Sequence, residues 1–250
     1  MKNLYNEIAS LPNEFAEQQK LPIIAENADY LKFISDIVGI DTDKVKSAIL
    51  DLHANNAFFA NFLPKLNKLD GLENAGDLRF HSLTVYLVVL LTRPKTMIET
   101  GVAFGKSSVY ALLAMSIIKK GRLYSYDLIP SGKLAIDGSS TSMDGFMSAT
   151  LVLNELRNHW TLVYGDSLKN IENMASCFGE GVDIFLHDSL HTFKHTKSEF
   201  DLVMSFGKKT KNTIFMCDNL EMGSGEFFDT LSNSHKLNRF SNFGVAVPWN

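Results

Sequence analysis

The spacing of hydrophobic positions changes near residue 77, and this change predicts two regions. Apolar residues before it recur at helical spacing, as in residues 30–38, and no strand pattern is visible. Gly39 should end that helix. Asp41 or Thr42 should begin the next helix, which should stop at Pro64. We therefore expect a helical amino-terminal region without strands.

Beyond residue 77, short apolar runs alternate with helical segments. After a helix over residues 78–91, this alternation is typical of a parallel sheet with helices on both faces. The predicted strands are Thr96–Glu99, Arg122–Tyr126, Thr161–Tyr164, Val182–Leu186, Thr213–Cys217 and, at an edge of the sheet, Gly244–Val247. The predicted helices are Ser107–Ile118, Met143–Asn158, Leu168–Met174, Thr192–Phe206 and Gly225–Ser232.

The expected fold class is α/β, a Rossmann-like, doubly wound, mostly parallel sheet with an amino-terminal helical cap. Residues 1–75 should form a cap or a dimerisation region, and residues 76–250 the Rossmann-like domain. In such sheets ligands bind where the strands end, near the point at which the strand order reverses. The residues that directly follow each strand are therefore the candidates for chemistry.

Composition narrows the class of function. The net charge of −4 disfavours nucleic acid as a partner. The two cysteines make no disulfide framework. The longest apolar run, residues 83–91, is shorter than the roughly 20 residues that span a bilayer, and the amino terminus lacks the apolar core of a signal peptide. We expect a soluble, cytoplasmic protein without a membrane partner.

The segment MIETGVAFGKSS, residues 97–108, contains a glycine turn between a strand and a helix. Gly101 and Gly105 follow Glu99, and Ser107 opens the helix, whose free N–H groups can hold a ligand. Three residues separate the glycines, one too few for a P-loop, and the pattern G-x-G-x-x-G of dinucleotide sites is absent. A bent turn without any ligand is the alternative interpretation.

The pattern Glu-x-Gly-x-x-x-Gly-x-Ser resembles motif I of class I S-adenosylmethionine-dependent methyltransferases. In that family, the acid and the glycine turn hold the methionine end of the cofactor, which implies such a role for Glu99, Gly101, Gly105 and Ser107.

Two later strand ends extend this candidate cofactor site. Asp127 ends the second strand, where an acid accepts hydrogen bonds from ribose hydroxyls. Gly165, Asp166 and Ser167 follow the third strand, and the resemblance places a Gly-Asp pair there beside the adenine. Taken singly, each acid is also a good helix or turn cap.

Carboxylates also follow the fourth and fifth strands. Asp188 follows one, and Asp218 with Asn219 follows the other, a set of oxygen ligands that suits Mg²⁺. The arrangement resembles the divalent-metal-dependent O-methyltransferases of the catechol and caffeoyl-coenzyme A group, which implies that Asp188, Asp218 and Asn219 bind the metal. That group has a lysine three places after the first Asp. Here His191 stands there, which is similar to macrolide and sugar O-methyltransferases with a histidine base, so His191 and Asp188 are the predicted catalytic residues.

The remaining histidines have competing interpretations. His187, His191 and His195 are spaced four apart, so a zinc site is an alternative, although zinc prefers a closed tetrahedral set of ligands. His187 is either part of the cofactor site or a buried residue bonded to a backbone carbonyl. His195 lies on a helix surface or supports a neighbouring site residue, and the Asp218-Asn219 pair has the alternative of a loop cap.

These observations together predict methyl transfer from S-adenosylmethionine to a hydroxyl of a small molecule such as a sugar or polyketide. Mg²⁺ should assist, and His191 should take the proton. The loop over residues 129–147 should act as a lid, and the amino-terminal helices should cover the site or form a homodimer face. A metal-independent N- or protein methyltransferase and a non-catalytic cofactor-binding or scaffold module are the alternatives.

Overall fold

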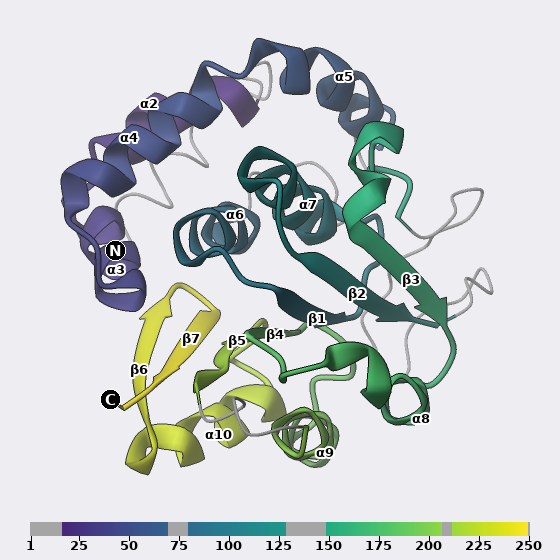
Figure 1. Ribbon diagram of the computed structural model, residues 1–250. Coiled ribbons are helices and arrows are strands. Elements are labelled where there is room, and N and C mark those ends of the chain that lie inside the picture. Colours follow the sequence, from purple (N-terminus) through teal and green to yellow (C-terminus); the bar gives the residue numbers. More distant parts are fainter. Residues whose placement is uncertain (1–16, 70–79, 129–148, 207–211, 250) are drawn as a thin grey trace.

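Seven strands form one sheet in the order β3-β2-β1-β4-β5-β7-β6 (Figure 1). The computed structural model describes residues 17–69, 80–128, 149–206 and 212–249. The strands are β1 (Thr96–Thr100), β2 (Arg122–Asp127), β3 (Trp160–Tyr164), β4 (Ile184–His187), β5 (Ile214–Cys217), β6 (His235–Phe240) and β7 (Phe243–Pro248). The first five are parallel, whereas β7 runs antiparallel to both β5 and β6. The predicted mostly parallel, doubly wound sheet is confirmed.

Helices lie on both faces of the sheet (Figure 1). One face carries α6 (Phe80–Thr92) and α7 (Lys106–Ile118), and the other carries α8 (Ser167–Asn173), α9 (Phe193–Met204) and α10 (Gly223–Thr230). The amino-terminal helices are α2 (Glu17–Ala25), α3 (Ala28–Val38), α4 (Thr42–His53) and α5 (Asn56–Asn67), and they form an outer arc beyond α6 and α7. Short 3-10 turns occupy Asn154–His159, Ala175–Phe178 and Leu231–Asn233.

Strand residues alternate between two hydrophobic clusters, one on each face of the sheet. Met97 and Leu186 belong to the cluster that contains α6, α7 and the amino-terminal helices, whereas Ile98 and Phe185 belong to the cluster that contains α9 and α10. Successive side chains of a strand point to opposite faces, so apolar runs without polar gaps indicate a sheet covered on both sides. None of the described helices is long and apolar enough to cross a membrane.

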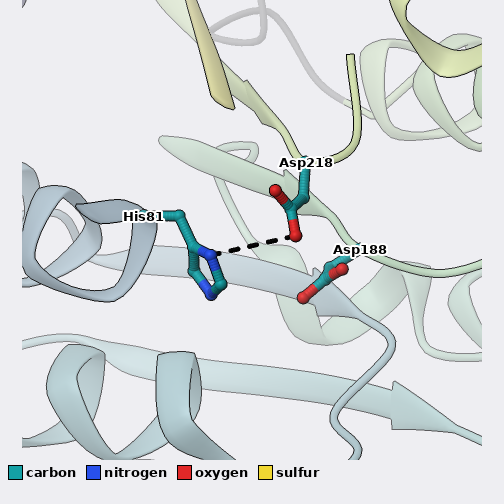
Figure 2. A group of neighbouring side chains, drawn as sticks. All are labelled: His81, Asp188 and Asp218. Carbon is teal, nitrogen blue, oxygen red and sulfur yellow. Dashed lines mark ion pairs between the residues drawn. The ribbon is translucent and has the colours of Figure 1, made fainter. Parts of the chain in front are cut away.

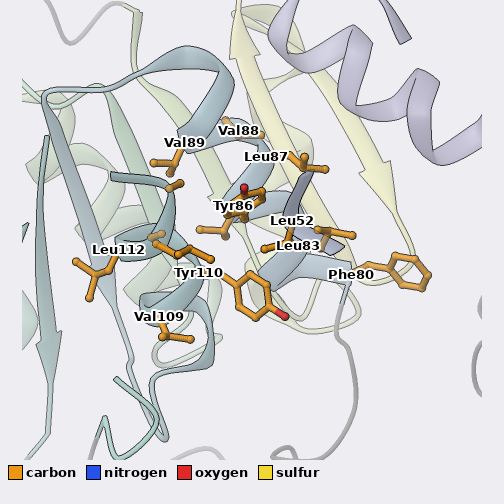
Figure 3. Packing of buried hydrophobic residues seen from close by; sticks show 14 of the residues in the cluster. Leu52, Phe80, Leu83, Tyr86, Leu87, Val88, Val89, Val109, Tyr110 and Leu112 are labelled. Carbon is orange, nitrogen blue, oxygen red and sulfur yellow. The ribbon is translucent and has the colours of Figure 1, made fainter. Parts of the chain in front are cut away.

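The amino-terminal helices pack against α6, within the same hydrophobic cluster (Figure 3). Gly39 ends α3 as predicted, with a left-handed backbone at φ 68°. The single helix expected up to Pro64 is wrong, because Asn55 interrupts it and caps α5 by accepting the backbone N–H of Phe58 at 3.1 Å. Pro64 lies inside α5, whose buried phenylalanines hold the helix together around it. The expected domain boundary after residue 75 lies outside the described residues.

The prediction of a helix over Met143–Asn158 is wrong in its described part. Residues 149–151 form a turn, residues 152–153 have no regular secondary structure, and only Asn154–His159 is helical, as a 3-10 turn. The reason is that the glycine turn takes up these backbone groups. The N–H of Ala149 donates to the Ala103 carbonyl at 2.7 Å, and that of Leu151 to the Phe104 carbonyl at 3.0 Å. Residues 143–148 and the predicted lid lie outside the described residues.

The sheet also ends differently from the prediction. Residues 243–248 do form a strand, but β7 lies between β5 and β6 and is not at the edge. The edge strand β6 has the sequence HKLNRF, whose mixed polar pattern gives no apolar run because one side of an edge strand faces solvent.

Candidate active site

The register of the sheet aligns the ends of β1, β4 and β5. Thr100 pairs with His187, and His187 pairs with Cys217. The next residues continue the row, since the Asp188 N–H donates to the Thr100 carbonyl at 2.9 Å and the Asp218 N–H to the His187 carbonyl at 3.1 Å. Both carboxylates therefore stand at the carboxyl edge of the sheet, beside the point between β1 and β4 where the strand order reverses.

The two glycines of the turn after β1 are required by close packing. Gly101 has a φ of 79°, and a Cβ there would lie 1.8 Å from the backbone oxygen of Asp188. Gly105 has a φ of 82°, and its Cβ would lie 3.0 Å from the Cα of Ala149. The glycine turn is thus packed between the Asp188 loop and the segment that precedes β3.

Glu99, the acid of the motif, cross-links the turn. It is fully buried, and its Oε2 accepts the hydroxyls of Ser108 and Ser125, each at 2.6 Å. Burial raises the pKa of the Glu99 carboxyl, and the serine hydrogen bonds offset this only in part. Its Oε1 is buried and has no hydrogen-bond partner among the described residues. Ser107 is buried at the start of α7, next to this carboxylate.

The amino-terminal helices reach the same turn through a buried ion pair. Lys106, the first residue of α7, pairs with Glu17 of α2, and both side chains are buried. The hydroxyl of Tyr110 donates to the other oxygen of Glu17 at 2.8 Å. The helical region therefore contacts the glycine turn directly.

The other predicted cofactor residues lie along the edge formed by β2 and β3. Asp127 is partly exposed at the end of β2, and its carbonyl accepts the N–H of Gly165 at 2.8 Å. Asp166 is exposed and caps α8 by accepting the backbone N–H of Lys169 at 2.9 Å. The hydroxyl of Ser167 donates to the buried Glu199 of α9.

Asp188 and Asp218 face each other and a third side chain, His81 of α6 (Figure 2). One ligand atom from each of the three lies within 4.8 Å of the other two. His81 Nδ1 is 3.8 Å from an oxygen of Asp218. Asp218 and His81 are buried, and Asp188 is partly exposed. Among the described residues this is the one group of three such side chains with metal-binding spacing.

His191 lies close to Asp188. Its Nε2 is 3.8 Å from Asp188 Oδ1, and the side chain is buried. Asn219 has a left-handed backbone at φ 53°, and its amide oxygen accepts the side-chain N–H of Asn242 at 3.4 Å. The structure thus brings His191 beside the carboxylates and directs the oxygen of Asn219 towards the turn between β6 and β7.

His187 and His195 belong to a buried network centred on Glu199. His187 is fully buried, with Nδ1 2.7 Å from Glu199 and Nε2 3.0 Å from the hydroxyl of Thr196. Its partner is therefore a carboxylate, and the expectation of a backbone carbonyl was wrong. His195 Nε2 lies 2.9 Å from the other oxygen of Glu199, so it supports a neighbouring residue.

Glu199 also connects the strand ends. It accepts the hydroxyl of Thr100 at 2.8 Å and that of Ser189 at 3.1 Å. Burial alone would raise the pKa of the Glu199 carboxyl, but hydrogen bonds from His187 and His195 outweigh it and hold the pKa well below its usual range. A charged carboxylate at the centre of β1, β4, α8 and α9 therefore fixes the loop that carries Asp188.

Two of these residues, His81 and Glu199, were missed by the sequence reasoning. His81 is the second residue of α6, a helix that precedes the first strand, and Glu199 lies in the middle of α9. Neither follows a strand, and that position was the signal used to select candidates. The apolar run after His81 is a sequence feature that indicates burial of that residue, whereas the sequence around Glu199 gives no such signal.

Comparison with known proteins identifies the fold and a family match over residues 98–220. The sequence profile of the methyltransferase domain family matches residues 98–220. No protein of curated function matches the sequence.

Solved structures share the fold at low sequence identity. An O-methyltransferase from Bacillus cereus, solved in complex with SAH, matches with a TM-score of 0.53 at 12% identity, over 87% of this chain and 96% of that chain. The O-methyltransferase TomG from Streptomyces achromogenes, involved in tomaymycin synthesis and solved with SAM, matches with a TM-score of 0.52 at 14% identity, over 78% and 91%. A provisionally named caffeoyl-CoA O-methyltransferase from Staphylococcus aureus matches with a TM-score of 0.57 at 14% identity, over 84% of this chain and 100% of that chain. Residues 98–220 of the chain thus match the methyltransferase domain family, and the chain shares its fold with these solved structures.

Proposed function

We propose that this enzyme transfers the methyl group of S-adenosylmethionine to a hydroxyl of a small molecule in the cytoplasm, assisted by a divalent metal ion. The observation that supports this most is the convergence of Asp188, Asp218 and His191 beside the glycine turn. A net charge of −4 favours a small acceptor over a nucleic acid.

The cofactor would lie along the carboxyl ends of β1, β2 and β3. The turn from Glu99 to Ser107 would hold its methionine end, because Gly105 precedes α7 without a side-chain cap and the helix can offer its first N–H groups. Asp127 would accept the ribose hydroxyls, and Asp166 with Ser167 would lie beside the adenine. Both ring nitrogens of His187 already have protein partners, so His187 would not bond to the cofactor directly. It would instead help to position this edge of the site through its bond to Glu199.

The acceptor would lie over the carboxylate pair. Asp188 and Asp218 would hold the metal ion. Asn219, the further ligand predicted from the sequence, would have to exchange its bond to Asn242 for the ion. When bound, such an ion lowers the pKa of an acceptor hydroxyl and fixes its position. His191 would take the hydroxyl proton, the acceptor oxygen would bond to the methyl carbon, and the bond from that carbon to the sulfonium sulfur would break. The products would be the methyl ether, S-adenosylhomocysteine and a proton carried away by His191.

Calorimetric titration tests the cofactor and the metal separately. We expect S-adenosylmethionine and S-adenosylhomocysteine to bind in the micromolar range in EDTA, and a separate Mg²⁺ or Mn²⁺ signal to be lost in Asp218→Ala. Cofactor binding with full activity in Asp218→Ala would favour a metal-independent N- or protein methyltransferase. Binding without turnover over a broad acceptor panel would favour a non-catalytic module.

His191→Ala tests the proposed base. We expect turnover to fall by about 100-fold or more, because general-base catalysis contributes on that scale, while cofactor affinity stays unchanged. His159→Ala is the matched control, since His159 bonds to the Gly121 carbonyl at the amino edge of the sheet and should leave turnover intact. Unimpaired turnover in His191→Ala would remove His191 from this role.

A further inference from the structure

The imidazole of His81 lies where a third metal ligand would stand. Its Nδ1 is 3.8 Å from Asp218 Oδ2, which is longer than a hydrogen bond of about 2.7–3.2 Å. Metal–ligand bonds of about 2.0–2.2 Å place two ligands of one ion about 3–4 Å apart. The 3.8 Å between His81 and Asp218 falls in this range, and no two of the three ligand atoms of His81, Asp188 and Asp218 are more than 4.8 Å apart.

The burial of Asp218 is a second, independent indication of a cation. Its side chain is 2% exposed, and Oδ1, the oxygen that does not face His81 Nδ1, is buried without a hydrogen-bond partner among the described residues. A buried carboxylate costs several kcal/mol unless a counter-charge or hydrogen bonds compensate it. Figure 2 shows Asp218 and Asp188 directed towards the His81 ring, so a shared cation would supply that compensation.

The His81 ring is held in place by packing. It stacks on Phe243 of β7, with ring centroids 5.6 Å apart and an angle of 28° between the planes. The amide oxygen of Asn219 is meanwhile bonded to Asn242. The third side chain near the two carboxylates therefore comes from α6, before the first strand of the sheet.

We propose that His81 binds the metal ion together with Asp188 and Asp218, and that the site prefers a divalent transition-metal ion such as Mn²⁺ to Mg²⁺. This inference rests on the metal-assisted mechanism proposed above and specifies its ligands. Mg²⁺ favours oxygen ligands throughout, whereas an imidazole nitrogen suits transition metals, and Mn²⁺ also accepts carboxylates.

Electron paramagnetic resonance with Mn²⁺ alone, and with Mg²⁺ as competitor, tests the proposal on the full chain. The wild-type protein should bind Mn²⁺ at least about tenfold more tightly than Mg²⁺, and bound Mn²⁺ should show nitrogen modulation from a directly bound imidazole. His81→Phe keeps an aromatic ring against Phe243. It should lose the modulation and weaken Mn²⁺ binding by about tenfold or more, while Mg²⁺ binding changes less than about threefold. His81→Asn, with a smaller side chain, should behave in the same way if His81→Phe does not fold.

His191→Ala is the control for the nearest other histidine, and it should keep both the modulation and the Mn²⁺ affinity. Modulation that persists in the His81 variants and disappears in His191→Ala would assign the nitrogen to His191 and overturn the proposal. Loss of Mn²⁺ binding in Asp218→Ala, with no effect in either His81 variant, would also overturn it but leave the metal-assisted mechanism standing. A wild-type protein that binds neither metal would overturn both.

Discussion

Replacing Gly101 with alanine is expected to lower the free energy of unfolding by about 3–5 kcal/mol. The added Cβ would lie 1.8 Å from the backbone oxygen of Asp188, far inside van der Waals contact. The Asp188 N–H, bonded to the Thr100 carbonyl at 2.9 Å, holds the start of the Asp188 loop against β1, so the loop cannot move away without breaking this bond. The φ of 79° at Gly101 adds about 1–2 kcal/mol for any residue with a Cβ.

The Gly39→Ala variant separates the energetic cost of the steric overlap at Gly101 from the cost of a strained backbone. Gly39 has a φ of 68°, and nothing lies within 4 Å of its Cβ position, so only the strain of about 1–2 kcal/mol should appear. Thermal unfolding of both variants measures the difference, at about 2–4 °C per kcal/mol for a chain of this size. Equal losses in the two variants would contradict the close packing of the glycine turn against Asp188. A further expectation is that Gly101→Ala weakens metal binding, because any relief of the overlap displaces Asp188.

The central sheet could be predicted because its strands are apolar on both faces. In β1 and β4, residues of either parity are buried, which gives short uninterrupted apolar runs bounded by turns. The edge strand β6 is only half covered, and its mixed sequence resembles that of a loop. The division between α4 and α5 depends on one capping side chain, Asn55, within an otherwise continuous helical pattern.

The residues of the candidate site also differ in whether the sequence alone could reveal them. Asp188 and Asp218 could be selected because each directly follows a strand, and the parallel register makes such residues neighbours. His81 reaches them only because α6 packs across the sheet, a contact between residues more than 100 positions apart. Glu199 lies in the sequence KSEFDL, which resembles a solvated helix surface until its five partners are seen in space.

Glu199→Gln is expected to lower the free energy of unfolding by about 3 kcal/mol or more. The substitution keeps the shape of the side chain but removes the charge that pairs with His187 and His195, and it replaces one of the two accepting oxygens by an NH2 donor. Asp201→Asn is the matched control on the same helix. Asp201 pairs with Lys197 at the exposed surface, so its loss should cost no more than about 0.5 kcal/mol. Urea unfolding of both variants measures the two costs.

The difference in the free energy of unfolding between the wild-type protein and Glu199→Gln should also depend on pH. The pKa of Glu199 is lowered in the folded protein, so its contribution is fully present above the ordinary value of 4.5 and is lost as the pH falls below it. The hydrogen bond to Glu199 raises the pKa of His195, although burial opposes this. The contribution of His195 is therefore present below 6.5 and is lost as the pH rises through its folded-state value. Unfolding measured from pH 3 to pH 9 should show the largest difference between the two proteins at about pH 4.5–6.5. A difference that is independent of pH would mean that Glu199 carries no charge in the folded protein, and the buried network would then hold the Asp188 loop by neutral hydrogen bonds alone.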